Sequence, residues 1–297
     1  MRRARILILP LILVLLVCAL ALLSPLPAQP SPQTLNVTFT TIDVPGAGYT
    51  GVNAINTAGD MVGNYGQSTD TDSHGFLYSN GTFTYFDYPD GQNKTIPLGI
   101  NDSGLISGYS GNLPVVGFIY DGTTFTTIKD GSDTATFVQG INNKGDVVGG
   151  SGTIFTTKGF RMRGGRFMTL NFPGVYTYAS ASAINNLGML VGSTSSPNQA
   201  YLYKNGQFKN IDFPGANNSE AFGINDSGLA VGWYDSPGCF CAFVYKNGKF
   251  TSFSYPGAAF TEALGINNLG QIVGAYTFDF QEYHGFVTNP VSETDFR

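Results

Sequence analysis

The sequence carries little charge. Only 12% of its 297 residues are charged, whereas about 25% is usual in globular proteins. Glycine is abundant instead, with 39 residues, and 13% of the residues are aromatic. Such a composition favours many short strands joined by tight turns. The net charge of −5 and the absence of an evident basic cluster argue against nucleic acid as a partner.

Recognisable catalytic motifs are missing as well. The sequence contains no G-x-S-x-G nucleophile elbow and no glycine-rich phosphate loop in a βα pattern, so it indicates no catalytic residue. It has only two histidines, His74 and His284, and no zinc-ligand spacing. Both precede Gly-Phe in repeated units that we expect to be neighbours, and packed sheets lie about 10 Å apart. We therefore expect each ring to bond a nearby backbone or hydroxyl group rather than share a metal.

Residues 1–28 form a separate segment. A basic start, MRRAR, precedes an apolar run at 6–23 and the small residue Ala28, a pattern that predicts a secretory signal peptide. Its cleavage would remove three arginines, change the net charge from −5 to −8, and leave a secreted, periplasmic or extracellular protein. An uncleaved N-terminal anchor is the alternative, since such a run can just span a bilayer. Residues 29–35 are expected to form a linker.

The remaining chain repeats one unit six times. Each unit contains Ile-Asn, with a glycine three residues after the asparagine and another seven residues after it. The spacing of 40 to 45 residues between asparagines suits a four-stranded blade of a β-propeller. We therefore predict an all-β fold over residues 36–290, a six-bladed β-propeller with four-stranded antiparallel blades. The repeated asparagines are Asn56, Asn101, Asn142, Asn185, Asn225 and Asn267.

The last unit predicts how the ring closes. In the other units a GFLY-like third strand leads through a tight turn, such as Asn80-Gly81, into a fourth strand. In the last unit Asn289-Pro290 replaces that turn, and no fourth strand follows. Residues 36–46 match the fourth-strand pattern and precede the first unit. We therefore predict that this N-terminal strand joins the last blade, with residues 291–297 left as a C-terminal tail.

One face of such a propeller carries variable loops, and function on rigid scaffolds usually lies on loops of this kind. Acidic and aromatic residues gather in these segments. They could contact the faces and hydroxyls of a sugar, or bind a cation or a cationic peptide. The alternative is a solvated acidic surface above ordinary packing between blades. The ligand-binding candidates are Glu220, Glu262, Tyr176, Tyr178, Asp235, Phe280 and Tyr283.

Two of these candidates, Glu220 and Glu262, occupy equivalent positions on adjacent blades near the expected channel mouth. A carboxylate pair there could act as acid and base, or help to hold Ca²⁺. No third acid occupies this position in the repeats, so solvated loop ends are the alternative. The preceding position carries Ser or Thr in five of the six units. No other cofactor is indicated.

Cys239 and Cys241 flank Phe240. An exported protein permits a disulfide, but residues two apart in an extended strand lie at the upper limit of bridging distance. A local disulfide, two free thiols, and a redox or metal role therefore remain as alternatives. Trp233 follows the second repeated glycine, and we expect it to pack between blades rather than serve as a ligand platform.

The unit GINxxGxxVG, followed by HGFLYxNGxFTxFDYPG, resembles the HAF repeat of extracellular bacterial proteins, named for a His-Ala-Phe triplet before the last turn. The resemblance covers about residues 36–290. The triplet is degenerate here, with HGF at 74–76 and 284–286 and CAF at 241–243. The likeness implies an exported protein of tandem repeats, and it carries over no catalytic residues.

These observations favour a binding or interaction module for an extracellular glycan, peptide or cell-surface component, with no membrane span after signal cleavage. A metal-dependent hydrolase or lyase with its site at the channel mouth is one alternative. A passive structural protein of the envelope is the other. The sequence alone does not choose the ligand.

Overall fold

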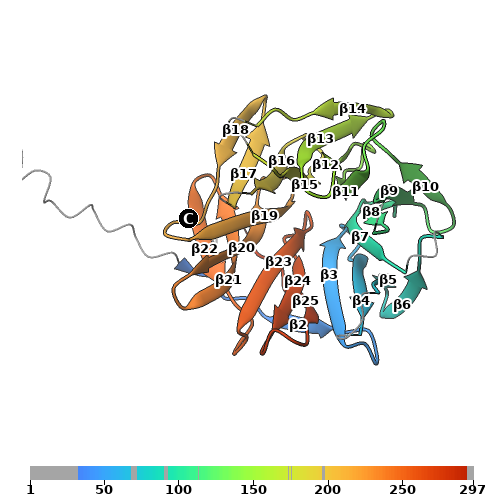
Figure 1. The fold of residues 1–297 in the computed structure, drawn as a ribbon. Coiled ribbons are helices and arrows are strands. Elements are labelled where there is room, and N and C mark those ends of the chain that lie inside the picture. Colours follow the sequence, from blue (N-terminus) through green and yellow to red (C-terminus); the bar gives the residue numbers. More distant parts are fainter. Residues whose placement is uncertain are drawn as a thin grey trace, which may run out of the picture. The chain divides into compact units, whose positions relative to one another are not determined.

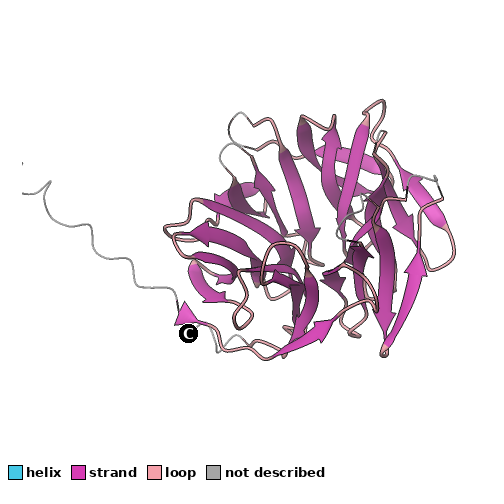
Figure 2. Ribbon diagram, turned by 60° about the horizontal axis from the view of Figure 1, so that its bottom comes forward, coloured by secondary structure: helices cyan, strands magenta, loops and turns pink. Residues whose placement is uncertain are grey.

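The computed structural model describes residues 33–67, 72–89, 93–112, 114–172, 174, 176–195 and 198–292. All of them belong to one compact unit, Pro32–Arg297. The predicted signal peptide and the end of the predicted tail lie outside the described residues. The described chain is built of strands and connecting loops (Figure 2). It contains no helix with the length and apolar character that crossing a bilayer would need.

Six sheets are arranged in a ring as blades, so the predicted propeller is confirmed (Figure 1). Blade one contains β3 (Tyr49–Ile55), β4 (Met61–Gly66), β5 (His74–Ser79) and β6 (Thr82–Phe86). Blade two contains β7 (Thr95–Ile100), β8 (Ile106–Ser110), β9 (Val116–Tyr120) and β10 (Phe125–Ile128). Blade three contains β11 (Ala135–Ile141), β12 (Val147–Gly152), β13 (Thr157–Arg163) and β14 (Arg166–Thr169).

The second half of the ring repeats this order. Blade four contains β15 (Ala179–Ile184), β16 (Leu190–Thr194), β17 (Gln199–Lys204) and β18 (Gln207–Asn210). Blade five contains β19 (Asn218–Ile224), β20 (Ala230–Ser236), β21 (Cys239–Lys246) and β22 (Lys249–Phe253). Blade six contains β23 (Phe260–Ile266), β24 (Ile272–Thr277), β25 (His284–Thr288) and, from the start of the chain, β2 (Phe39–Ile42).

The N-terminal strand closes the ring as predicted. β2 pairs antiparallel with β25, in a register that runs from Phe39 opposite Thr288 to Ile42 opposite Gly285. The Phe39 ring packs edge-on against Phe286, with 5.3 Å between centroids. Asn289 then caps the pair, because its side chain accepts a hydrogen bond from the Thr38 N–H. This arrangement covers the strand edge that β25 would otherwise expose.

Part of the expected linker is ordered. Gln33–Thr34 form a short strand, β1, which pairs in parallel with β22 and gives blade five a fifth strand. Leu35 follows and is buried, and its N–H donates to the carbonyl of Ser252. The local sequence did not predict this strand. It forms because the free edge of β22 offers a hydrogen-bonding partner.

The repeated glycines have a packing role. Each third strand except β17 places a fully buried phenylalanine between blades, as Phe286 does in β25. A Cβ on Gly274, in the neighbouring strand, would clash with the Glu262 carbonyl and come within 2.9 Å of the Phe286 ring. The small residue before each Ile-Asn serves close approach at the axis: a Cβ on Gly265 would lie 3.0 Å from the Cα of Ala54 on the next blade.

Candidate functional site

The two ends of the central channel differ in chemistry. We call the end with the Ile-Asn-x-x-Gly turns and the turns between third and fourth strands the turn face. The opposite end, where the longer loops lie, is the loop face. The most regular repeat of the sequence lies at the turn face, and most of the candidate residues lie at the loop face.

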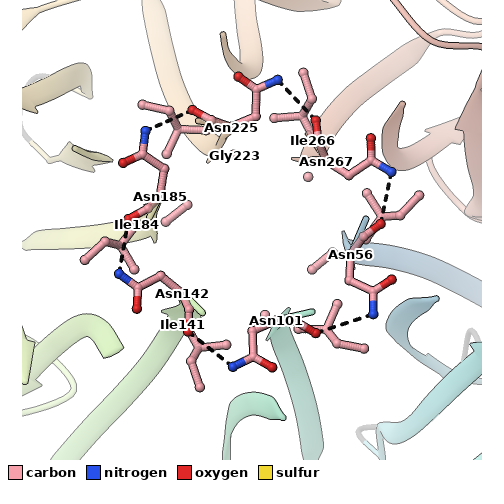
Figure 3. Close-up of a pocket in the computed structure, with 18 of the residues that line it drawn as sticks. Asn56, Asn101, Ile141, Asn142, Ile184, Asn185, Gly223, Asn225, Ile266 and Asn267 are labelled. Carbon is pink, nitrogen blue, oxygen red and sulfur yellow. Dashed lines mark hydrogen bonds between the residues drawn. The ribbon is translucent and has the colours of Figure 1, made fainter. Parts of the chain in front are cut away.

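On the turn face the six repeated asparagines form a closed ring (Figure 3). The side-chain Nδ2 of each donates to the backbone carbonyl of the equivalent asparagine on the next blade, at 2.9 to 3.4 Å, and Asn267 closes the circle onto Asn56. The carboxamide oxygen caps its own turn. Asn185 Oδ1, for example, accepts from the N–H groups of Leu187 and Met189.

The ring engages both the nitrogen and the oxygen of each asparagine side chain. Each asparagine uses its amide donor towards the next blade and its carbonyl oxygen within its own turn, and all six are buried. The repeated asparagine is therefore a structural device that ties the blades together at the axis. Sequence reasoning found the repeat but not the ring, because the bonded partners lie some 40 residues apart.

At the loop face the structure brings Glu220 on β19 and Glu262 on β23 together. Burial raises the pKa of both carboxyls. The pKa of Glu262 reaches about 7, first because of burial and second because of the nearby charge of Glu220. No positive charge among the described residues counteracts these shifts. The pair therefore holds less than its full negative charge at neutral pH and can both donate and accept hydrogen bonds.

Three further polar groups surround the pair. Asn198, in the loop between β16 and β17, donates its Nδ2 to Glu220 at 3.4 Å. Burial and then the charge of Glu220 raise the pKa of Tyr178. Burial and then the charge of Glu262 raise the pKa of Tyr283. Segments from blades four, five and six thus contribute to one polar cluster.

Aromatic rings, two of them exposed, adjoin this cluster. Phe260 lies at their centre, with ring centroids 5.6 Å from Trp233, 6.2 Å from Phe240, 6.4 Å from Phe280 and 6.5 Å from Tyr283. Phe240 is 45% exposed and Phe280 is 53% exposed. Exposed apolar rings beside half-buried acids suit a ligand that has both an apolar and a polar part. We call Trp233, Phe240, Phe260 and Phe280 the ring cluster.

Local geometry holds the two most exposed rings in place. Phe280 has a left-handed backbone with φ of 63°, and its N–H donates to Thr277 Oγ1 at 2.9 Å. A phenylalanine in this conformation is uncommon and signals a constrained loop. Phe240 is flanked by a disulfide between Cys239 and Cys241, whose Cα atoms are 5.4 Å apart. The left-handed Gly238 precedes this disulfide in the turn between β20 and β21.

Five of the predicted residues therefore belong to this region: Glu220, Glu262, Tyr178, Phe280 and Tyr283. Asp235 instead binds Asn218, accepting from its N–H at 2.6 Å and from its side-chain amide at 3.0 Å. Tyr176 packs against Gly174 in the loop between β14 and β15.

Sequence reasoning missed the role of Phe240 and of Asn198. The expected packing of Trp233 between blades is observed, since it contacts Phe260 of the next blade. The signal for Phe260 was available: it lies two residues before Glu262 and so on the same side of the strand. Phe240 and Asn198 had no comparable signal, because loop geometry alone positions them.

The only candidate metal ligands in this region of the described chain are the carboxylates of Glu220 and Glu262. Among the described ranges, no group of three or more His, Cys, Asp or Glu side chains lies together as metal ligands would. The hydroxyls beside the glutamates serve the backbone: Ser219 accepts from the Phe213 N–H at 3.0 Å, and Thr261 accepts from the Tyr255 N–H at 3.0 Å. A Ca²⁺ ion at this position would need further oxygen ligands from a bound molecule or from water.

The two histidines bind carboxylates, which corrects the expected backbone or hydroxyl partner. His74 Nδ1 lies 2.9 Å from Asp87 Oδ2, and His284 Nδ1 lies 2.8 Å from Asp43 Oδ2. Both aspartates follow a fourth strand, directly beside the start of the third strand that carries the histidine. The equivalence of the two pairs indicates that they fasten the outer part of blades one and six.

The raised pKa of Glu262 predicts a pH-dependent stability. The unfolded chain releases this proton near 4.5, whereas the folded chain retains it to about 7. Because the folded state binds more protons in this window, the free energy of unfolding falls as pH rises through it. We expect a contribution of roughly 3 kcal/mol that is present below the lower value and lost by the upper one.

Urea unfolding over this pH range tests the assignment. Glu262→Gln should remove the corresponding part of the slope, whereas Glu282→Gln, an exposed acid on the neighbouring loop, should leave it unchanged. An identical slope in the wild type and Glu262→Gln would show that Glu262 titrates normally.

Comparisons with solved structures find other proteins of similar architecture. Neither a protein-family model nor a curated protein matches the sequence. A gluconolactonase structure from Xanthomonas campestris is 10% identical, with a TM-score of 0.52, and the match covers 89% of this chain and 94% of that one. A structure provisionally described as a gluconolactonase is 14% identical, with a TM-score of 0.53, over 88% and 97% of the two chains. A streptogramin B lyase is 11% identical, with a TM-score of 0.49, over 88% of each chain.

At these identities the likeness establishes architecture alone. The chain is a six-bladed β-propeller. Propellers host many unrelated activities, so the role of this one has to be argued from its own residues.

Proposed function

We propose that this propeller is an exported binding module whose loop face takes a basic, partly apolar peptide segment of an extracellular or cell-surface partner. The observation that carries the proposal is the pair of half-buried carboxyls, Glu220 and Glu262, beside the partly exposed ring cluster. Membership of the HAF-repeat family and export through the leader at residues 1–28 fit this role and are part of the proposal.

The charge of the acid pair favours a ligand that carries a basic group. The acid pair has no cation beside it that counteracts its raised pKa values. A lysine or arginine side chain entering the mouth would favour the ionised form of Glu262 and release its proton. The rings add to this attraction, because ammonium and guanidinium groups bind favourably over aromatic faces. Phenylalanines, which have no polar tip, also suit an apolar neighbour of the basic residue in the ligand.

Binding to peptide probes tests the proposal. Peptides that place Lys or Arg next to an aromatic residue should bind the whole chain, while their acidic counterparts should not. We expect Glu220→Gln to weaken binding by about tenfold or more, since a charged hydrogen bond is lost. Phe280→Ala should weaken it about three- to tenfold through lost ring contact.

Matched variants on the same loop control for indirect effects. Phe278 is also 53% exposed but packs on Tyr276, away from the ring cluster, so Phe278→Ala should bind normally. Glu282→Gln removes one exposed charge and should do the same. Equal losses in target and control variants, or preferential binding of neutral sugars on a glycan array, would reject the basic-peptide assignment.

One observation favours a second candidate, an enzyme that uses acid–base catalysis. A carboxyl with a pKa of about 7 next to a second carboxyl is suited to transfer protons near neutral pH. In this case Glu262→Gln should abolish turnover of a hydrolase or lyase substrate while leaving its binding intact. A substrate panel without turnover, together with tight peptide binding, would favour the binding module.

A further inference from the structure

A second polar site lies on the turn face, between blades three and four, away from the proposed peptide site. It is built around Arg161 on β13. In the other five blades the same position of the third strand is aliphatic, so the fold does not require a charge there. The equivalent residues are Leu77, Ile119, Leu202, Val244 and Val287.

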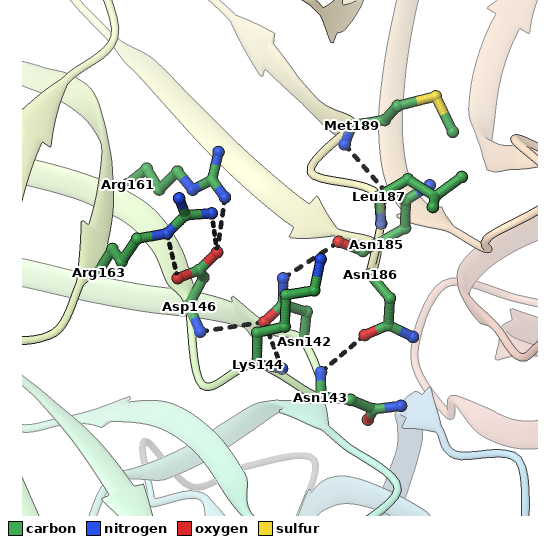
Figure 4. Close-up of polar contacts among 10 residues, drawn as sticks. All are labelled: Asn142, Asn143, Lys144, Asp146, Arg161, Arg163, Asn185, Asn186, Leu187 and Met189. Carbon is green, nitrogen blue, oxygen red and sulfur yellow. Dashed lines mark hydrogen bonds and ion pairs between the residues drawn. The ribbon is translucent and has the colours of Figure 1, made fainter.

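Asp146 binds Arg161 together with a second arginine (Figure 4). Arg161 donates to Asp146 Oδ2 at 2.6 Å, and Arg163 donates to both carboxylate oxygens at 2.8 and 2.9 Å. The pKa of Asp146 is held at about 2 although the residue is buried. The largest cause is hydrogen bonding from Arg163, and the hydrogen bond and charge of Arg161 add to it. One carboxylate thus serves two guanidinium groups.

The cluster is short of negative charge. Two guanidinium groups face a single carboxylate, and the exposed Lys144 on the adjoining turn adds a third positive charge. The side chain of Arg161 is only 16% exposed, and its Nε is buried without a hydrogen-bond partner. An anion beside these groups would offset the net positive charge of the cluster.

A cavity adjoins these donors. It has a volume of about 250 Å³ and is lined by Lys144, Arg161 and Arg163 on one side and by Gly188, Tyr203 and Asn205 of blade four on the other. Gly188 lies directly against Arg161, since a Cβ at this position would be in van der Waals contact with the guanidinium at 3.5 Å. The opening is therefore large enough for more than a simple ion and presents positive groups on one wall.

We propose that this cavity binds an oxyanion group, a carboxylate, sulfate or phosphate, carried on a ligand about the size of one sugar unit. Guanidinium groups recognise such oxyanions through paired N–H donors, and Tyr203 offers a ring and a hydroxyl to the remainder of the ligand. The sequence showed no evident basic cluster, but the structure places one here. The described chain has three arginines, and all lie on the β13–β14 hairpin: Arg161, Arg163 and Arg166.

Calorimetric titration of the whole chain at low salt tests the site. The probes are glucuronate, inorganic sulfate and inorganic phosphate, with neutral glucose as the uncharged counterpart of glucuronate. We expect the anions to bind and glucose not to bind. Tighter binding of glucuronate than of sulfate and phosphate would assign the ligand to an acidic sugar, and the reverse order would assign it to a free inorganic anion.

The decisive variant is Arg161→Leu, which restores the aliphatic residue of the other blades and leaves Asp146 paired with Arg163. It should weaken anion binding by at least about tenfold. Lys249→Gln removes one positive charge from the turn face of blade five and should change the affinity by less than about twofold. If Arg161→Leu does not fold, Arg163→Gln, at a side chain that is 58% exposed, provides the same test.

Two results would overturn the proposal: no heat of binding with any anion, or equal affinity in the wild type and both arginine variants. Either would leave Arg161 and Asp146 as a structural ion pair only. Because the peptide site lies at the other end of the channel, its success or failure does not affect this outcome.

Discussion

Removal of residues 1–42 is expected to abolish cooperative folding of the propeller. This shortened chain loses β2, and with it all four residue pairs that complete blade six. It also loses the buried Ile42 and the Phe39 ring, which packs on Phe286 and lies 5.0 Å from Tyr255. Burial of these side chains and the lost strand pairing together correspond to roughly 5 kcal/mol or more, a large part of the stability of a typical domain.

The shortened chain should also associate, because β25 would become an exposed strand edge next to an open core. Thermal unfolding followed by circular dichroism, together with light scattering, measures both effects. A chain that begins at residue 35 is the control, since it loses only β1 and keeps β2. Monomeric, cooperative unfolding at the wild-type midpoint in the chain without β2 would show that the ring does not depend on this closure.

Asn185→Ala is expected to lower the free energy of unfolding by about 2 to 4 kcal/mol, because one substitution removes three hydrogen bonds, two of them buried. The lost bonds are those to the Asn225 carbonyl and from the N–H groups of Leu187 and Met189. The Met189 N–H would remain buried without an acceptor, which costs more than its bond contributes, whereas the Asn225 carbonyl keeps its bond from the Gly228 N–H. The substitution would also remove one of the hydrogen bonds that join blade four to blade five on the turn face.

The neighbouring Asn186 is the matched control for urea unfolding. Its side chain donates to Asp226 at 2.8 Å and accepts from the Asn143 N–H at 2.8 Å. Both bonds lie in more exposed surroundings than those of the ring. Asn186→Ala should therefore cost only about 1 to 2 kcal/mol. Equal losses in the two variants would mean that the closed ring adds nothing beyond ordinary turn contacts.

The sequence predicted the blades because their determinants are local. The glycine three residues after each asparagine adopts the left-handed conformation that its turn requires, as Gly145 does with φ of 74°. Asn289-Pro290 ends the last repeat, and the spare strand at the start of the chain completes it. Each of these signals lies within about ten residues, so reading them required no knowledge of distant contacts.

The candidate site was predicted in part. Equivalent repeat positions placed Glu220 and Glu262 on neighbouring blades, which the structure brings together. Their raised pKa values could not be foreseen, because burial depends on the loops of three blades. Asp235 looked equally suitable in sequence, but Asn218 binds both of its carboxylate oxygens. The exposure of Phe240 and Phe280 depends on loop conformations that the sequence pattern did not reveal.

The site at Arg161 shows a different limit. Alignment of GFRM at 159–162 with GFLY at 75–78 places an arginine at an aliphatic position, so the substitution is visible in the sequence. Only the structure shows that Asp146 must serve two arginines and that a cavity adjoins them. The positions of charged residues along the chain do not show which of these residues contact each other in the fold.

The amino-acid sequence by itself determined the number of blades, the strand order and the joining of the two ends, since these follow from short-range turn chemistry repeated at a regular spacing. The tertiary structure alone decided which polar groups are satisfied and which remain available. That distinction depends on burial and on partners 40 or more residues away. The asparagines, the most regular feature of the sequence, bond to one another and to their own turns, while the acid pair and Arg161 retain capacity to bind a ligand.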